Sequence, residues 1–255
     1  MALIYRTTGA IDLESIGAAV QRAIGMANGG IVRVDEASEA TSLDPLFLVG
    51  MVMLIAAMAF KIALVPFHMW TPDVYTGAPA SSVGFMATAV KAAGFAVLIR
   101  VLFVALGPEP TRIGAHGWVS ILFWLAAITI VVGNLLAIVQ HNVKRMLAYS
   151  SIAHAGYALV GVIAAGSFGT QVVEGEPVVL GFMANSSVLL YLLGYLFAIL
   201  GAFGVLAYLR RGDDDLQTYD DFDGLASRQP LLAAAMALFM LSSAGFPATA
   251  GFIGK

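Results

Sequence analysis

The sequence predicts an all-α membrane protein, a bundle of several membrane-spanning helices in which some helices are discontinuous. Of its 255 residues, 60% are hydrophobic and 11% are charged, whereas a soluble domain carries about 25% charged residues. Six apolar stretches approach or exceed the roughly 20 residues that a helix needs to cross the hydrocarbon. Prolines interrupt two of them, at Pro66 and at Pro247, and a proline inside a helix kinks or breaks it.

The apolar stretches follow one another along most of the chain. Residues 46–255 are predicted to form part of one membrane domain. Its spans are placed near 46–65, 80–106, 118–139, 143–166, 178–209 and 230–254. Strand-like alternation is absent, so the backbone must satisfy its hydrogen bonds within helices.

Residues 1–45 precede these spans and have a different character. They are predicted to contain the end of a truncated span, a weakly amphipathic surface helix capped by Asp12 or Ser15, and a polar loop. Because Lys255 follows an apolar run directly, a terminal carboxylate there would be costly. We therefore expect the sequence to be a piece of a longer membrane protein.

Basic residues in the connecting segments predict the orientation. The loops after the first, third and fifth spans carry more of them than the loops on the other side, so the first side is predicted to be cytoplasmic. The richer side holds Lys144, Arg145, Arg210, Arg211 and Arg228; the other holds Arg22, Arg33 and Arg112, with Arg100 close to a span end.

Composition excludes several kinds of site. Without cysteine there are no disulfides, no Cys-ligated zinc and no iron–sulfur cluster, and there is no glycine-rich nucleotide loop. Any redox chemistry is thus expected on another chain. Six aspartates between residues 213 and 223 form either a metal site or a solvated acidic loop, and the solvated loop is favoured.

Lys61 lies in the second half of the first span, shortly before Pro66. A broken helix at membrane depth persists where its freed backbone faces protein or water. A break beside a lysine therefore indicates a hydrated ion path. The alternative is that the Lys61 side chain extends to the interface. His68, just beyond the break, is either a proton entry group or a structural residue.

Lys91 lies near the middle of the second span, with about a dozen apolar or small residues on each side. A charge at this depth costs about 2.5–3.5 kcal/mol on insertion scales. Because burial disfavours the charged ammonium, such a lysine can release and take up a proton. No acidic residue lies in the middle of a span, so Lys91 is predicted to carry protons or to pair with an acid outside this sequence.

The fourth span places Ser150, His154 and Tyr157 on one helical face. A histidine titrates at about pH 6.5 and can relay protons in either direction. A neutral His154 that is hydrogen-bonded between helices is an equal alternative. In the last span, Gly245-Phe246-Pro247 repeats the break, and Lys255 follows it.

Three segments resemble one family. The sequence PFHMWTPDVYTGAP over residues 66–79 is similar to the signature of subunit N of the proton-pumping NADH:quinone oxidoreductase, respiratory complex I. NVKRMLAYSS over residues 142–151 with His154, and GFPATAGFIGK over residues 245–255, resemble the same subunit in the same order. Related cation/proton antiporter subunits share the beginning of the first segment, whereas its continuation from Asp73 is typical of subunit N.

The resemblance implies an antiporter-like fold with two inverted repeats, each containing a discontinuous helix. Lys61 then corresponds to the lysine beside the first break, which pairs with a membrane glutamate two spans earlier. Lys91 corresponds to the central lysine of the next span, His154 to a histidine on the polar axis, and Lys255 to the lysine of the second break. These residues would translocate protons, with His68 as a possible entry group.

The resemblance also implies partners and location. The partners would be the other membrane subunits of complex I, the lipid bilayer and protons, with no nucleic acid. NAD, FMN, iron–sulfur clusters and quinone would be bound by other subunits, and the membrane would be a bacterial plasma membrane or an organelle inner membrane. Two alternatives remain: a sodium/proton antiporter subunit or stand-alone transporter, and a purely structural membrane subunit.

Overall fold

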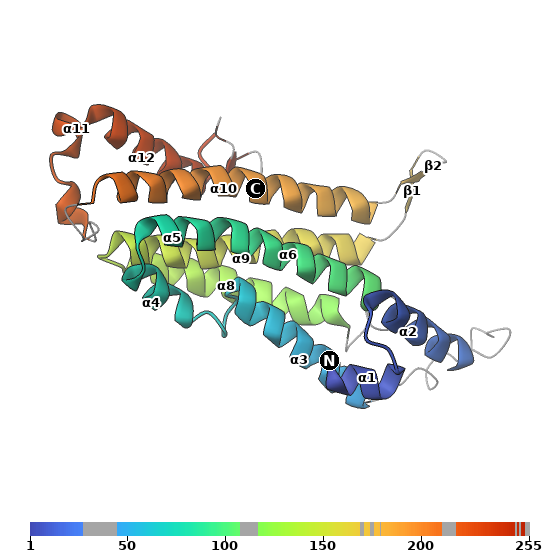
Figure 1. Cartoon of the computed structure of the whole chain (residues 1–255). Helices are drawn as coiled ribbons and strands as arrows, with labels where there is room; N and C mark the ends of the chain where they lie inside the picture. The colour runs from blue at the N-terminus through green and yellow to red at the C-terminus, as the bar shows by residue number, and fades with distance from the viewer. Residues whose placement is uncertain are drawn as a thin grey trace.

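The computed structural model describes all residues except 28–44, 108–116, 169–170, 174–175, 179, 211–217, 248, 250 and 253–255. Helices form nearly all of this part of the chain (Figure 1). They are α1 (Ala2–Thr8), α2 (Leu13–Ala27), α3 (Pro45–Ile62), α4 (Trp70–Gly77), α5 (Ala80–Phe85), η2 (Met86–Val90), α6 (Lys91–Arg100), η3 (Val101–Ala105), α8 (Trp118–Ile138), α9 (Val143–Phe168), α10 (Leu180–Tyr208), η4 (Tyr219–Phe222), α11 (Leu225–Arg228) and α12 (Pro230–Ala244).

Five of the described helices are long and apolar enough to cross a membrane. They cover Pro45–Ile62, Ala80–Ala105, Trp118–Ile138, Val143–Ser167 and Ala184–Tyr208. The predicted class, an all-α membrane protein with discontinuous helices, is therefore confirmed. In the predicted sixth span, near 230–254, α12 is shorter, with 15 residues. It ends because Gly245 adopts the left-handed conformation, with a φ of 82°, which stops a helix at low cost only for glycine.

One short β-hairpin was not predicted. Strands β1 (Gln171–Val173) and β2 (Glu176–Val178) pair antiparallel between α9 and α10, with Gln171 opposite Val178. The prediction failed because three residues are too few to show the two-residue alternation that identifies a strand. The hairpin occupies position 178, where the fifth span was expected to begin, and α10 begins at Leu180.

The second span is one continuous helical rod that contains two π-helical segments. Both η2 and η3 are π-helical turns, in which the backbone bonds run from residue i to i+5. Lys91 is the first residue after η2. Single π turns inside α-helices are found frequently at functional sites, and this one places the lysine at the junction of two helical geometries.

The spans lie side by side, and α9 is central among them (Figure 1). Helix α9 packs against α8 on one side, α10 on another and the short helix α4 near its beginning. The last residues of α4, α8 and α10 lie at one end of the bundle, whereas α2 and the β-hairpin lie at the other (Figure 1). This is the grouping of loops on which the predicted orientation depends.

Helix α2 begins with the predicted cap and buries its apolar face. The Asp12 carboxylate accepts a hydrogen bond from the Ser15 backbone N–H, 2.8 Å away. Hydrogen bonding by Ser15, through its side chain and then its backbone, lowers the pKa of the Asp12 carboxyl. Ile16 and Val20 are buried, and α2 packs against η3 and α1, so α2 closes one end of the bundle.

The half-helix α4 is held to α9 by two consecutive basic residues. Lys144 Nζ donates to the carbonyls of Thr76, at 3.3 Å, and Ala78, at 2.7 Å. Arg145 Nη1 forms a 2.9 Å ion pair with Asp73 Oδ1. Lys144 is 1% exposed, and it satisfies carbonyls at the end of α4, where a helix lacks internal partners and favours a cation.

Helices α8 and α9 approach each other closely at Gly133. A Cβ atom added there would lie 2.8 Å from the Ala153 backbone nitrogen and 3.0 Å from its Cα. Close approach of backbones at small residues is the usual way in which membrane helices gain packing energy. The contact therefore depends on the missing side chain of Gly133.

Gly133→Ala should push α8 away from α9 and destabilise the protein. We expect a loss of about 1–3 kcal/mol, typical of overpacking, visible as a lower midpoint of thermal denaturation in detergent. Gly204→Ala in α10 is the control, because its added Cβ meets nothing within 4 Å and alanine favours a helix. Equal midpoints for the two variants would contradict the proposed close packing.

Lys144→Met should loosen α4. The change leaves buried carbonyls without their charged donor, and bonds of this kind contribute about 1.5–3 kcal/mol. Asp73→Asn removes the neighbouring ion pair, whose aspartate side chain is 72% exposed, so it should cost about 0–1 kcal/mol. Thermal denaturation compares the two variants, and a larger loss for Asp73→Asn would refute the assigned role of Lys144.

Candidate functional site: a buried lysine and a row of polar side chains

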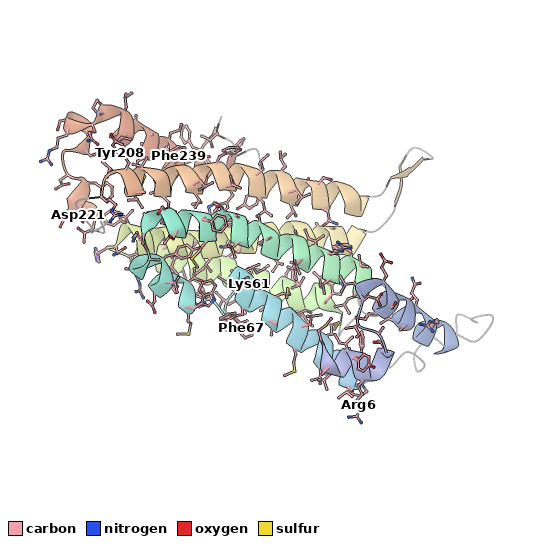
Figure 2. All side chains as sticks on the ribbon, viewed as in Figure 1. Arg6, Lys61, Phe67, Tyr208, Asp221 and Phe239 are labelled. Atoms are coloured by element: carbon pink, nitrogen blue, oxygen red, sulfur yellow. The ribbon has the colours of Figure 1, made fainter. Side chains whose placement is uncertain are left out.

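The break after α3 lies where it was predicted, between Lys61 and His68. Helix α3 ends at Ile62, and Ala63 adopts a left-handed conformation with a φ of 62°. Pro66 lies within the connection, and α4 resumes the helical path at Trp70. Figure 2 shows Lys61 at the end of α3, with Phe67 in the connection beyond it.

Protein groups satisfy part of the backbone that the break frees. The Val65 N–H donates to Thr129 Oγ1 on α8 at 3.1 Å, and the Trp70 indole donates to the Phe60 carbonyl at 3.2 Å. Thr129 is fully buried. This is the arrangement required at membrane depth, since lipid offers no hydrogen bonds to unpaired backbone.

Lys61 lines an apolar groove between α3 and the α5–α6 rod. The groove has a volume of about 630 Å³ and also involves Phe60, Phe85 and Val97. The Lys61 side chain is exposed in it, and its Cγ would lie 3.9 Å from a Cβ placed on Gly94. Lys61 therefore faces an open side of this chain, and its role in proton transfer stays a prediction.

Lys91 has the opposite environment. Its side chain is 5% exposed, and Nζ donates to the backbone carbonyl of Ser151 at 2.7 Å and to Ser151 Oγ at 2.5 Å. Within the described part of the chain, no carboxylate forms an ion pair with it. A buried ammonium group held only by neutral oxygen atoms is poorly compensated, and such a group can change its protonation state at modest cost.

His154 lies on α9, one helical turn after Ser151, and is also buried. Its Nδ1 is 2.5 Å from the Tyr191 hydroxyl on α10. The rings of Tyr195 and Tyr157 pack against it, with centroids at 4.9 and 5.9 Å. A hydrogen-bonded histidine within an aromatic cage fits both predicted alternatives, the proton carrier and the structural residue.

The polar row extends beyond His154 to α8. The Tyr157 hydroxyl accepts a 3.0 Å hydrogen bond from Asn134 Nδ2, and Asn134 is exposed. Polar side chains thus continue from buried Lys91, past Ser151 and His154, to a residue at the outer face of α8. The row crosses α6, α9, α10 and α8.

Other predicted site residues lie away from this row. His68 is half-buried in the connection after α3, and its ring centroid is 6.4 Å from that of Tyr149. Pro247 is exposed just after α12 ends. Near it the chain returns to α12, where the Gly251 N–H donates to the buried Ser242 hydroxyl. Lys255 lies outside the described residues.

The acidic segment has a structural use where it is described. Asp221 Oδ2 accepts bonds from the Thr218 N–H and hydroxyl, each at 2.8 Å, and so caps η4. In the described residues no group of His, Asp or Glu side chains is arranged to hold a metal ion. Residues 213–215 of the predicted cluster lie outside the described residues.

Sequence reasoning missed the side chains that complete the row. Ser151, rather than its neighbour Ser150, contacts Lys91, and Tyr191 and Tyr195 come from α10. The signal available in the sequence was the four-residue spacing of Tyr191 and Tyr195, which places both on one helical face. It does not reveal the facing helix.

Comparisons with known proteins agree with this architecture. The profile of the family described as "NADH:quinone oxidoreductase/Mrp antiporter, TM" matches residues 1–175 and 176–255. NADH-quinone oxidoreductase subunit N 1 of Sorangium cellulosum is 44% identical over 255 residues, which are 100% of this chain and 45% of the relative. Subunit N of Trichlorobacter lovleyi is 42% identical over the same shares. The chain thus spans about half the length of these relatives.

Solved structures show the same fold. A chain of respiratory complex I from Thermus thermophilus with bound aureothin has a TM-score of 0.68 and 35% identity, over 99% of this chain and 45% of that one. A chain of the Mrp complex from a Dietzia species has a TM-score of 0.72 at 21% identity, over 99% of this chain and 39% of its own, which shows the fold alone. The chain therefore belongs to the NADH:quinone oxidoreductase/Mrp antiporter transmembrane family, and the predicted resemblance to subunit N is confirmed.

Proposed function

We propose that this chain is part of the proton-translocating membrane subunit of an NADH:quinone oxidoreductase. The observation that carries the proposal is the environment of Lys91, a buried ammonium within an apolar span whose hydrogen bonds, among the described residues, go to the two oxygen atoms of Ser151. The similarity to subunit N relatives supports the assignment to this complex. Electron transfer, with NAD, FMN, iron–sulfur clusters and quinone, belongs to other subunits in this proposal.

Lys91 is the central proton carrier in this mechanism. When protonated, its ammonium donates to the Ser151 carbonyl and hydroxyl oxygens. When neutral, the amine can accept a hydrogen bond from the Ser151 hydroxyl, which is both donor and acceptor. Ser151 can therefore accompany either protonation state by rotating its hydroxyl group.

Lys61 supplies the electrostatic control. It faces the groove between α3 and α6, and its stem lies beside Gly94, three residues after Lys91. The resemblance implies that a membrane glutamate of the full-length subunit pairs with this lysine. Forming or releasing that pair changes the local charge near Lys91, and a nearby positive charge favours loss of its proton. Protons then pass towards His154 and the Lys255 region.

The proposed location is the plasma membrane of a bacterium, in keeping with the bacterial relatives. The proposed cytoplasmic end of the bundle is the one that holds Lys144, Arg145, Arg210 and Arg228, because short cytoplasmic loops carry an excess of basic residues. The partners are the lipid bilayer and the other membrane subunits of the complex.

Lys91→Met tests the role of this lysine in the full-length subunit within its complex. We expect NADH-driven acidification of proteoliposomes to be lost while the complex still assembles. Assembly should survive, because replacing a poorly compensated buried charge by an apolar side chain of similar size is often neutral or stabilising. Undiminished pumping would defeat the proposal, and loss of assembly would favour a purely structural subunit.

Lys91→Arg separates proton exchange from positive charge. Arginine keeps the charge but is not deprotonated in proteins, so pumping should again be lost. Pumping at the wild-type rate would show that charge alone suffices and would remove Lys91 from the path. The same preparations in sodium-free buffer distinguish the antiporter alternative, which predicts that transport stops without sodium.

A further inference from the structure

We propose that Tyr195 on α10 holds a water site that connects the Lys91–Ser151 pair to the His154–Tyr191 pair, and so closes the proton path between these two carriers. This inference rests on the proposed function. The observation that supports it is a buried hydroxyl group without a partner. Tyr195 is 6% exposed, and its Oη forms no hydrogen bond with any described residue.

The position of Tyr195 follows from the antiparallel packing of α9 and α10 (Figure 1). Ser151 and His154 are three residues apart on α9, about 4.5 Å along the helix axis. Tyr191 and Tyr195 are four residues apart on α10, about 6 Å along its axis. With the helices antiparallel, Tyr191 meets His154 and Tyr195 lies level with Ser151.

Three hydroxyl groups converge at this level. The hydroxyl groups of Tyr195 and Tyr75 both lie near the Ser151 side chain and near each other, but Tyr195 Oη forms no hydrogen bond with any described group. Tyr75 is buried on α4, so the half-helix after the break also contributes to the cluster. Ser151 Oγ is at the same time 2.5 Å from Lys91 Nζ. The unpaired Tyr195 hydroxyl is thus surrounded by polar atoms.

Water is the ligand that fits such a position. A buried polar group without a protein partner costs about 1–3 kcal/mol, and buried waters typically pair with groups of this kind through two to four hydrogen bonds. The hydroxyls of Tyr195, Tyr75 and Ser151 supply such partners. A water molecule is also small enough to reorient within a closed site.

The transfer conserves protons at every step. A Lys91 N–H bond breaks as an O–H bond forms on Ser151 Oγ, while the original Ser151 hydroxyl proton moves to the water. That water passes a proton to the oxygen of Tyr191, with Tyr195 holding it in place by a hydrogen bond. The original Tyr191 proton then moves to His154 Nδ1, 2.5 Å away. Lys91 ends neutral and His154 ends protonated.

The packing of the Tyr195 ring in the helix bundle does not require its hydroxyl group. The ring packs against His154 with a centroid distance of 4.9 Å, and phenylalanine would keep that contact. Phenylalanine would also remove the cost of burying the hydroxyl. A tyrosine at this place is therefore explained by its oxygen atom and not by its packing.

Tyr195→Phe is the first test, made in the full-length subunit within its complex. We expect the number of protons pumped per NADH oxidised to fall severalfold, with assembly and the midpoint of thermal denaturation unchanged or raised. Tyr208→Phe is the matched control, because Tyr208 is exposed at the far end of the same helix (Figure 2). Pumping by Tyr195→Phe at the level of the control would overturn the proposal.

Replacement of Tyr195 by a fluorinated tyrosine is the second test, and it remains informative if the phenylalanine variant fails to assemble. Fluorination keeps the ring and the hydroxyl but makes the hydroxyl a stronger acid and a weaker acceptor. We expect the pumping rate to change without a change in thermal stability. An unchanged rate would show that this hydroxyl does not take part in transfer, and the inference would fall.

Lys91→Met in parallel separates the two proposals. If Lys91→Met pumps normally, the proposed function fails, and the Tyr195 connection fails with it. If Lys91→Met loses pumping while both Tyr195 variants keep it, the proposed function stands and the Tyr195 connection alone is rejected. Loss of pumping in Lys91→Met together with reduced pumping in Tyr195→Phe supports the complete path.

Discussion

The membrane interior offers a charged group no partner, so the architecture depends on how this chain accommodates one ammonium group. Lys91 is surrounded by apolar helices, and in the part of the chain that the structure describes it donates to the carbonyl and hydroxyl of Ser151 alone. This contact joins the second span to α9, the helix against which α8, α10 and α4 all pack. Polar side chains are concentrated along α9, and the surfaces of the neighbouring helices that face away from α9 are apolar. Exposed Phe123 and Trp124 on α8 illustrate the apolar exterior.

The same constraint explains how the chain tolerates a broken helix. Backbone groups released after Ile62 cannot be left to lipid, and Thr129 and Trp70 take part in satisfying them. Lys144 completes the far end of α4. Because Lys144 and Ser151 both belong to α9, the segment after the break and the buried lysine are fixed by a single element. Tyr75 of α4 also lies near Ser151, so the segment after the break and the buried lysine share a neighbour on α9.

The scaffold by itself does not define the chemistry. Nearly the same arrangement of helices occurs in a chain of complex I and in a chain of an Mrp complex, at 35% and 21% identity. Function on a shared fold resides in particular side chains, and the ones proposed for this chain are the lysines, the histidine and the hydroxyl groups between them. Lys61 faces an open apolar groove, whereas Lys91 and His154 are enclosed within this chain. Lys91 therefore has its whole environment within this chain, whereas one side of Lys61 is open.

The sequence by itself determined the membrane class, the positions of the long spans, the break near Pro66 and the depth of Lys91. Each of these follows from local composition or from the geometry of proline, which act over a few neighbouring residues. It did not determine the π turn before Lys91, the short hairpin or the contact between Lys91 and Ser151. Those depend on which helix faces which, and apolar spans with hydrophobic side chains on all sides carry little periodic signal about the facing surface. Only the tertiary structure decided that Tyr191, Tyr195 and Tyr75 meet the polar face of α9, because helix packing brings together residues that lie on separate helices far apart in the sequence.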